Sequence, residues 1–375
     1  MLVTRIRVLV VDDSVVVRRL VTDSLSRDPD IEVVGFASNG RIALSKVDQL
    51  GPDLVTMDIE MPEMNGIEAV RALRRARHTM PIIMFSTLTE RGASATLDAL
   101  VAGATDYVTK PANVGSVQES LAQVAGQLIP KIKALVPRRA EVPAAVVPSQ
   151  ATAAVPVLRS PARGPVTTRP MPPVHPVQAL IIGSSTGGPE ALSRVLSNLS
   201  APPPVPVLLV QHMPPVFTRQ LAARLDRLGP ATVVEAADGD ALRAGTVYVA
   251  PGDHHLELRR SAGTLRVAIT DGPPVNFCRP SVDVLFRSAV REFGGHLLSV
   301  VLTGMGADGR TGCEDVVSAG GTVLVQDEAT SVVWGMPGAV ATAGLAHRIL
   351  PVGEVAPAIE SVLARSGTAV PSGGR

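Results

Sequence analysis

The sequence lacks the features that mark secreted, membrane-spanning and nucleic-acid-binding proteins. Its 375 residues include only two cysteines, Cys278 and Cys313, whose spacing suits neither a disulfide framework nor a zinc cluster. Charged residues make up 18% of the chain and the formal net charge is +1, so no basic face for nucleic acid is indicated. No run approaches the ~18 apolar residues of a membrane-spanning helix. Residues 1–13 carry no signal-peptide cleavage pattern. We therefore expect a cytoplasmic protein without direct membrane insertion and without a nucleic-acid partner.

Proline is concentrated in one long segment without regular apolar pattern. Residues 136–176 hold ten prolines and five arginines against one glutamate, without a helical or alternating apolar period. Proline fixes φ and removes a backbone donor, so this segment is predicted to be a semi-extended tether. The sequence therefore predicts one domain over residues 1–130, a Pro-rich linker over 131–176 and a second domain over 177–375, each domain within the usual size range.

In both domains, short β-branched stretches alternate with helix-length amphipathic ones. This order predicts parallel sheets with right-handed crossovers. The expected strands cover residues 6–11, 31–37, 54–57, 82–85 and 106–108, then 179–182, 207–210, 247–249, 297–302 and 322–325. The expected helices of the first domain cover residues 15–26, 41–49, 66–76, 93–101 and 114–128. The predicted fold class is α/β, with a flavodoxin-like and then a Rossmann-like domain, each a doubly wound parallel sheet.

Polar residues follow the expected strands of the first domain. Functional groups of open parallel sheets gather beyond the carboxyl ends of the strands. Asp12, Asp13 and Asp58 stand at such ends, as do Ser86 and Lys110. Carboxylates crowded at one edge repel one another unless a hard cation such as Mg²⁺ lies among them. The alternative is that these aspartates are ordinary helix caps and turn residues.

Three motifs of the first domain are distinctive together: VVDDS at residues 10–14, MDIEMPEMNG at 57–66 and TKP at 109–111. In these motifs the chain resembles the receiver domain of two-component response regulators, over residues 5–128. The resemblance implies that Asp58 accepts a phosphoryl group. It also implies a set of contact residues: Asp13, Asp58 and the carbonyl of Glu60 for Mg²⁺, with Asp12 close by, and Ser86 and Lys110 for the phosphoryl oxygens. Thr87 is the alternative to Ser86 as the hydroxyl that contacts the phosphoryl group.

The second domain begins with a strand that runs directly into GSSTGG at residues 183–188, followed by a helical pattern from Pro189. The segment matches G-x-S-x-G, which places Ser185 at the crest of a strand-to-helix turn where a nucleophile is exposed. Glycines before a helix N-terminus also suit a phosphate cradle. A dinucleotide site is disfavoured, because the glycine spacing is not G-x-G-x-x-G.

Two further strand ends of this domain present catalytic side chains. His212 follows the strand 207–210, and Asp308 follows the strand 297–302. A serine hydroxyl needs a base, and an imidazole serves best when a carboxylate fixes its tautomer. The order Ser185, His212, Asp308 differs from that of α/β-hydrolases, which excludes an ordinary member of that class.

The motifs IGSSTGG, QHMP and LTGMGADG resemble the catalytic domain of chemotaxis methylesterases, over residues 177 to about 366. The resemblance implies a nucleophile Ser185, a general base His212, an orienting carboxylate Asp308 and an oxyanion donor in the backbone N–H of Met305. It implies a phosphorylation-activated enzyme that demethylates glutamate esters, and deamidates glutamines, on chemotaxis receptors, with a histidine kinase as phosphodonor. Mg²⁺ is expected in the receiver domain and no cofactor in the esterase.

The pairing of the two domains suggests how activity is controlled. We expect the unphosphorylated receiver domain to pack against the catalytic cleft and block it, and phosphorylation of Asp58 to shift that equilibrium. Three other readings stay open: an esterase in a non-chemotaxis signalling array, a nucleic-acid-binding output and a non-catalytic scaffold. No Arg- or Lys-rich recognition helix occurs in residues 177–375, and the catalytic positions are intact.

Overall fold

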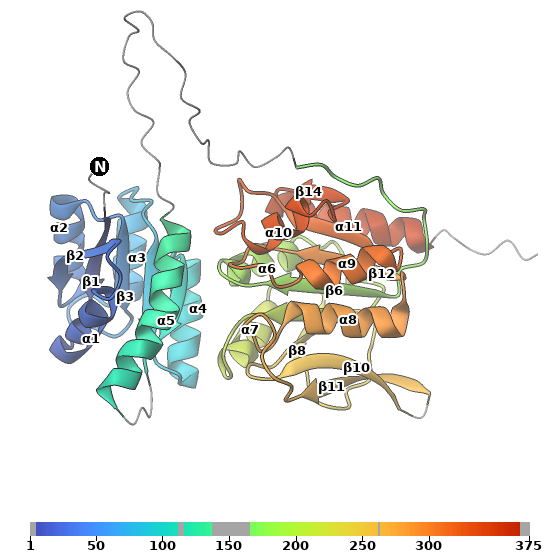
Figure 1. Cartoon of the computed structure of the whole chain (residues 1–375), viewed down its shortest axis with the longest axis horizontal. Coiled ribbons are helices and arrows are strands. Elements are labelled where there is room, and N and C mark those ends of the chain that lie inside the picture. The colour runs from blue at the N-terminus through green and yellow to red at the C-terminus, as the bar shows by residue number, and fades with distance from the viewer. Residues whose placement is uncertain (1–4, 112–115, 137–165, 262, 368–375) are drawn as a thin grey trace, which may run out of the picture.

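The computed structural model describes residues 5–111, 116–136, 166–261 and 263–367, which form two α/β domains side by side (Figure 1). Residues 137–165, the central part of the predicted linker, lie outside the described residues. So do residues 114 and 115, where the last helix of the first domain was predicted to begin, and the tail 368–375. Among the described residues, none of the helices combines the length and apolar character needed to cross a bilayer.

The first domain is a five-stranded parallel sheet with strand order β2-β1-β3-β4-β5. Its strands are β1 (Ile6–Val11), β2 (Ile31–Ala37), β3 (Leu54–Asp58), β4 (Ile82–Ser86) and β5 (Asp106–Thr109). Its helices are α1 (Val15–Leu25), α2 (Gly40–Leu50), α3 (Gly66–Arg75), α4 (Glu90–Val101) and α5 (Val117–Leu135). Helices α1 and α5 pack together on one face, and α2, α3 and α4 follow one another on the other. The predicted flavodoxin-like sheet is confirmed.

The second domain is a seven-stranded parallel sheet with strand order β14-β13-β12-β6-β7-β9-β8. Its strands are β6 (Ala179–Ser184), β7 (Val207–Gln211), β8 (Thr232–Glu235), β9 (Thr246–Val249), β12 (Leu297–Val301), β13 (Thr322–Gln326) and β14 (Arg348–Leu350). An antiparallel hairpin, β10 (His255–Ser261) and β11 (Thr264–Thr270), stands outside the sheet.

Helices cover both faces of this second sheet, as a doubly wound fold requires. They are α6 (Gly188–Ser197), α7 (Phe217–Leu225), α8 (Val282–Phe293), α9 (Arg310–Ser318), α10 (Met336–Thr342) and α11 (Val352–Gly367). Helices α6, α7 and α11 bury their apolar faces in one core layer, and α8, α9 and α10 bury theirs in the other. The predicted Rossmann-like arrangement is confirmed, with four strands that the sequence pattern did not reveal: β8, β14 and the hairpin.

The missed strands share a physical cause. Strands β8 and β14 are the two edge strands of the sheet, are only four and three residues long, and are partly exposed. The hairpin places three arginines, at 259, 260 and 266, among its apolar positions. Short or charged strands give a weak alternating signal, because only one of their faces is buried.

The structure describes residues at both ends of the predicted linker. Helix α5 continues through Pro130 to Leu135, beyond the predicted boundary at residue 130. At the other end, the backbone N–H of Arg169 donates to Ala346 O at 2.8 Å, so residues near 169 lie along the second domain.

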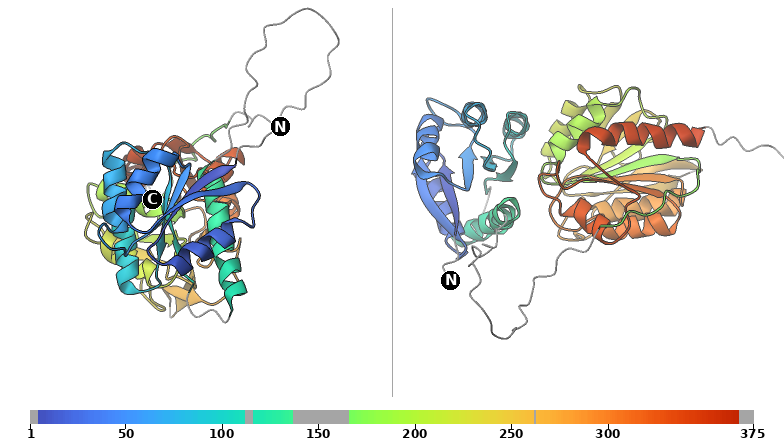
Figure 2. Two further views of the ribbon diagram at one scale, coloured as in Figure 1. Left: turned by 90° about the vertical axis from the view of Figure 1, so that its left-hand side faces the viewer. Right: turned by 90° about the horizontal axis from the view of Figure 1, so that it is seen from above.

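Helix α4 of the first domain contacts α6 and α7 of the second, and α4 and α5 lie on the side of the first domain that faces the second (Figures 1 and 2). The rings of Tyr107 and Phe217 stack with centroids 4.8 Å apart and an interplanar angle of 6°. Arg224 Nη1 on α7 lies 2.9 Å from Asp98 Oδ1 on α4. Buried apolar side chains from both domains form one continuous cluster. The first domain is therefore docked on the second in this structure.

Candidate active site and phosphorylation site

The carboxylate of Asp308 is held at the N-terminus of helix α8. Its side chain is almost fully buried, and each of its oxygens accepts several hydrogen bonds. The donors are Asn276 Nδ2 (3.0 Å), Ser281 Oγ (2.9 Å), Val282 N (2.7 Å), Asp283 N (3.2 Å) and His212 Nε2 (2.8 Å). Burial by itself raises the pKa of Asp308, but the hydrogen bond and charge of His212, with the other donors, lower it to about 2. A permanently ionised carboxylate therefore faces His212.

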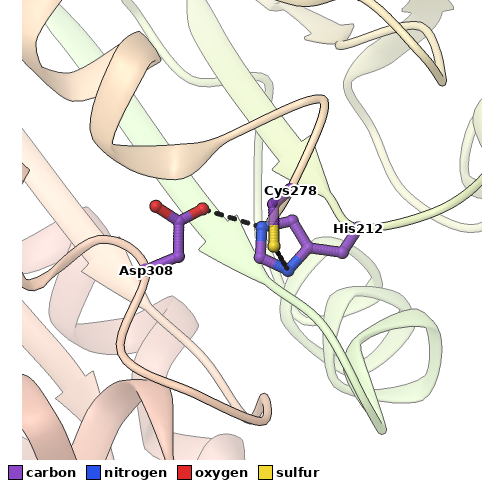
Figure 3. A group of neighbouring side chains, drawn as sticks. All are labelled: His212, Cys278 and Asp308. Carbon is purple, nitrogen blue, oxygen red and sulfur yellow. Dashed lines mark hydrogen bonds and ion pairs between the residues drawn. The ribbon is translucent and has the colours of Figure 1, made fainter. Parts of the chain in front are cut away.

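His212 follows β7 and is fixed by its neighbours at both ring nitrogens. Nε2 bonds Asp308 Oδ2 at 2.8 Å, and Nδ1 lies 3.6 Å from Cys278 Sγ (Figure 3). The side chain is 13% exposed. Burial would lower the pKa of His212, but the hydrogen bonds to Asp308 and Cys278 outweigh burial and raise it to about 9. Both partners therefore stabilise the protonated form of the ring.

Ser185 lies in the turn between β6 and α6, and its backbone is held from three sides. Its N–H donates to Thr303 O at 3.0 Å, while its carbonyl accepts from Gln211 Nε2 at 2.9 Å and from the Gly188 N–H at 2.7 Å. Gly187 has φ 77°, a left-handed conformation that glycine adopts without strain. Within the described residues, Ser185 Oγ makes no hydrogen bond with a protein atom. The turn thus presents an unengaged hydroxyl.

A cleft of about 830 Å³ brings these side chains to one surface. Ser185, His212 and Met305 line it together, whereas Asp308 lies behind His212. Among the described residues, the backbone N–H of Met305 donates to no protein acceptor. The structure therefore offers a hydroxyl, an imidazole backed by a carboxylate, and a free N–H donor at the same opening.

The loop 275–280 contributes functional side chains that sequence reasoning missed. Asn276 Nδ2 bridges Asp308 Oδ1 (3.0 Å) and Asp283 Oδ2 (2.8 Å). Cys278 contacts His212. The side chain of Phe277 is fully exposed at the cleft rim. The backbone of Phe277 has a φ of 63°. No motif or spacing in the sequence predicts these contacts, because the loop lies next to His212 only after segments distant in the chain have folded together. Nearby, His255 is structural, since its ring bonds Pro273 O and the Ser281 N–H.

The acidic residues of the first domain also converge. Carboxylate oxygens of Asp12, Asp13 and Asp58 lie within 4.8 Å of one another. Lys110 Nζ is 2.9 Å from Asp58 Oδ1 and 3.1 Å from Asp12 Oδ2. Burial, and then the charge of Asp12, raise the pKa of Asp58 to about 6, although Lys110 acts in the opposite direction. Burial lowers the pKa of Lys110, but Asp58 and Asp12 outweigh it and raise that pKa.

These residues fit a hard divalent cation. Asp12 Oδ2 is buried with no hydrogen-bond partner apart from its ion pair with Lys110. The cluster offers oxygen donors only, as Mg²⁺ prefers. Glu60 lines a hollow next to Asp13.

The two candidate hydroxyl groups differ in their surroundings. Ser86 Oγ, at the end of β4, is buried against Gly92 O (3.2 Å) and Thr96 Oγ1 (2.7 Å). Thr87 is exposed, and its hydroxyl bonds that of Thr89 at 3.2 Å. Neither hydroxyl bonds Asp58 in the described structure, so the choice between them stays a matter of proposal.

Comparison with known proteins agrees with this architecture. The family described as response regulator receiver domain matches residues 8–122, and the family described as CheB methylesterase matches residues 180–359. Together with the fold, these matches define the class: a two-domain response regulator whose output domain is an enzyme. A protein-glutamate methylesterase/protein-glutamine glutaminase of a Nocardioides species is 62% identical over 98% of both chains. One from Trichodesmium erythraeum is 45% identical over 97% of this chain and 99% of its own.

The chain belongs to the family of protein-glutamate methylesterase/protein-glutamine glutaminases, and the resemblance predicted from its motifs is confirmed. Solved structures resemble the separate halves. The catalytic domain of Thermotoga maritima CheB is 40% identical, with a TM-score of 0.49, over 50% of this chain and 98% of that one. The response regulator domain of the same protein is 46% identical, with a TM-score of 0.31, over 34% and 94%.

Proposed function

We propose that this enzyme hydrolyses glutamate methyl esters, and deamidates glutamines, on methyl-accepting chemotaxis receptors, with Ser185 as nucleophile. The observation that carries the proposal is the buried Asp308–His212 hydrogen bond of 2.8 Å at the cleft where the Ser185 hydroxyl is unengaged. The names of the family's members supply the substrate class. They do not favour a non-chemotaxis esterase, a nucleic-acid-binding output or a non-catalytic scaffold.

The reaction follows from the roles of these groups. His212, with its tautomer fixed by Asp308, accepts the Ser185 proton as Oγ attacks the ester carbonyl. The backbone N–H of Met305 donates to the oxyanion of the tetrahedral intermediate. His212 then protonates the departing methanol, or ammonia from a glutamine, and activates the water that hydrolyses the acyl-enzyme. Asn276 and the N-terminus of α8 keep the Asp308 carboxylate in place.

The receiver domain, for which we adopt the division 1–130, 131–176 and 177–375, is proposed to restrain this chemistry. Its residues Tyr107 and Gln127, with Lys131 on the same helix α5, line the same cleft. Beside the nucleophile, Thr186 Oγ1 donates to Asp106 Oδ2 of the receiver domain at 2.8 Å. We propose that this wall limits the approach of a receptor segment to Ser185, and that the receiver domain moves to admit it.

Phosphorylation of Asp58 by a histidine kinase is the proposed trigger. Asp13, Asp58 and the Glu60 carbonyl would hold Mg²⁺, with Asp12 next to them, and the ion neutralises charge on the carboxylates and the incoming phosphoryl group. Lys110 would pair with the phosphoryl oxygens. Ser86, buried at the end of β4, would turn toward them, and Thr87 is its rival. The esterase half needs no cofactor in this scheme, and the protein works in the cytoplasm beside its receptors.

Methanol release from a methylated receptor fragment tests the proposal on the full chain, with and without a small-molecule phosphodonor. Ser185→Ala should lower turnover by several orders of magnitude, because a triad acts as a unit. Ser193→Ala is the matched control, since Ser193 lies on the same helix α6 and its hydroxyl bonds Pro189 O. Full turnover by Ser185→Ala would refute the proposed nucleophile. Hydrolysis of other esters without methanol release from glutamyl esters would refute the substrate class.

A further inference from the structure

Cys278 contacts His212 but has no role in the proposed esterase reaction. Cys278 Sγ lies 3.6 Å from His212 Nδ1, the ring nitrogen that remains once Nε2 is engaged by Asp308 (Figure 3). A potential ligand atom from each of these three residues lies within 4.8 Å of the other two. A soft sulfur, an imidazole nitrogen and a carboxylate behind the imidazole are therefore aligned in that order.

The spacing suits a zinc ion between the sulfur and the nitrogen. Zinc–sulfur bonds of about 2.3 Å and zinc–nitrogen bonds of about 2.0–2.1 Å, at a tetrahedral angle, place the two ligand atoms about 3.6 Å apart. The observed separation is 3.6 Å. Histidines that bind zinc usually donate their second ring N–H to a carboxylate, which fixes the ring and strengthens the ligand. Asp308 already holds that position, at 2.8 Å from Nε2.

The cysteine is also held in place and accessible. Val275 and Cys278 exchange two backbone hydrogen bonds, of 3.1 and 2.9 Å, across the tight turn that carries the thiol. The next residue, Arg279, is anchored to Asp253 through two guanidinium contacts of 3.0 and 2.6 Å. Both Cys278 and His212 line the cleft of about 830 Å³, which leaves room for an arriving ion and for water as its further ligands.

We propose that Cys278 and His212 form a zinc site that inhibits the esterase. Zn²⁺ binds the Cys278 thiolate and Nδ1 of His212, while Nε2–H stays on Asp308 and water fills the open positions. The protons of the thiol and of Nδ1 pass to the buffer. The bound ion occupies the nitrogen that must accept the Ser185 proton, so hydrolysis stops. The inhibition rests on the proposed role of His212, whereas the binding itself does not.

Binding is tested with Co²⁺, which replaces zinc and gives a sulfur-to-metal charge-transfer band when a thiolate is bound. The full chain is titrated in excess Mg²⁺, so that the acidic receiver site is filled. The wild type and Cys313→Ser should show the band, and Cys278→Ser should not. Cys313 is the matched control because it is the other thiol of the chain and is fully buried. Absence of the band from the wild type, or its persistence in Cys278→Ser, would overturn the site.

A measurement on the unaltered chain guards against misfolding of a variant. Zn²⁺ should slow alkylation of Cys278 by iodoacetamide, read by peptide mass spectrometry, by about tenfold or more, because a thiolate bound to a metal is not available as a nucleophile. A chelator should restore the original rate. Equal alkylation rates with and without Zn²⁺ would contradict binding.

Inhibition is then measured as the ratio of methanol release without and with Zn²⁺, in the absence of phosphodonor. Micromolar Zn²⁺ should lower the wild-type rate by about tenfold or more, reversibly, and lower that of Cys278→Ser much less. If the charge-transfer band appears while turnover is unaffected, the proposed inhibition is wrong, and so is the proposed role of His212 as base. If inhibition is equal in Cys278→Ser, the cleft site is wrong while the esterase stands.

Discussion

Reversing one charge at the contact between the domains should release the enzyme from the receiver domain. Asp98 on α4 lies 2.9 Å from Arg224 on α7, and their side chains are 54% and 26% exposed. In water, unit charges at this distance attract by about 1.4 kcal/mol, and exposed pairs contribute ~0.2–1 kcal/mol in measurements. Asp98→Arg turns this attraction into repulsion, so we expect docking to weaken by about 1–2 kcal/mol, or ~5- to 30-fold in the docked-to-free ratio.

The assay is methanol release from a methylated receptor fragment without phosphodonor. The basal rate of Asp98→Arg should rise by up to that factor, and the increase should shrink at high salt because the pair is exposed. The double variant Asp98→Arg with Arg224→Asp restores opposite charges and should return the rate toward that of the wild type. The matched control is Asp23→Arg, since Asp23 on α1 pairs within its own helix with Arg19.

Two results would refute this reasoning. The first is a basal rate of Asp98→Arg within twofold of the wild type while small-angle scattering shows that the domains have separated. Docking of the receiver domain would then not be what limits access of the substrate to the catalytic cleft. The second is a double variant as active as the single one, which would mean that the ion pair does not contribute to docking.

The other predictions concern separate parts of the chain. Phe277→Ala should raise KM for the receptor fragment by roughly 10-fold or more, because a fully exposed ring at the cleft rim is then no longer buried by substrate; a fall in kcat alone would contradict this. Asp58→Asn should abolish activation by phosphodonor, measured as the ratio of methanol release with and without it, whereas Asp23→Asn should leave the ratio unchanged. Burial, then the charge of Arg169, lower the pKa of His347 below 6.5, and its Nδ1 accepts the Val323 N–H at 2.9 Å. The unfolded chain therefore binds a proton that the folded one does not, so the free energy of unfolding should fall as pH drops below about 6.5. His347→Phe should flatten that slope in urea titrations, and an unchanged slope would show that another group is responsible.

Much of the architecture followed from local pattern. The strands 6–11 and 31–37 have the predicted bounds at both ends, because a short apolar, β-branched run between turn residues identifies a strand without knowledge of its partners. The edge strands β8 and β14 were not predicted, because they are short and partly exposed. Where an element buries little, its sequence carries little periodic signal.

The candidate site divides in the same way. Ser185, His212 and Asp308 each follow a strand, and parallel strands place their carboxyl ends along one edge, so the sequence sufficed to propose that they meet. What it did not contain was the orientation of the imidazole. Nε2 points to Asp308 and Nδ1 to Cys278, which is 66 residues away in the chain. Ring orientation depends on contacts between distant segments.

The sequence by itself determined the two sheets and the residue types at their carboxyl edges, because these depend on the burial period and on short motifs within single segments. Only the tertiary structure decided which residues of the receiver domain line the catalytic cleft, and that a thiol from the loop 275–280 stands at the nitrogen proposed to act as base. Both are contacts between surfaces. Such contacts depend on shape and charge brought together by folding, and no period along one chain segment encodes them.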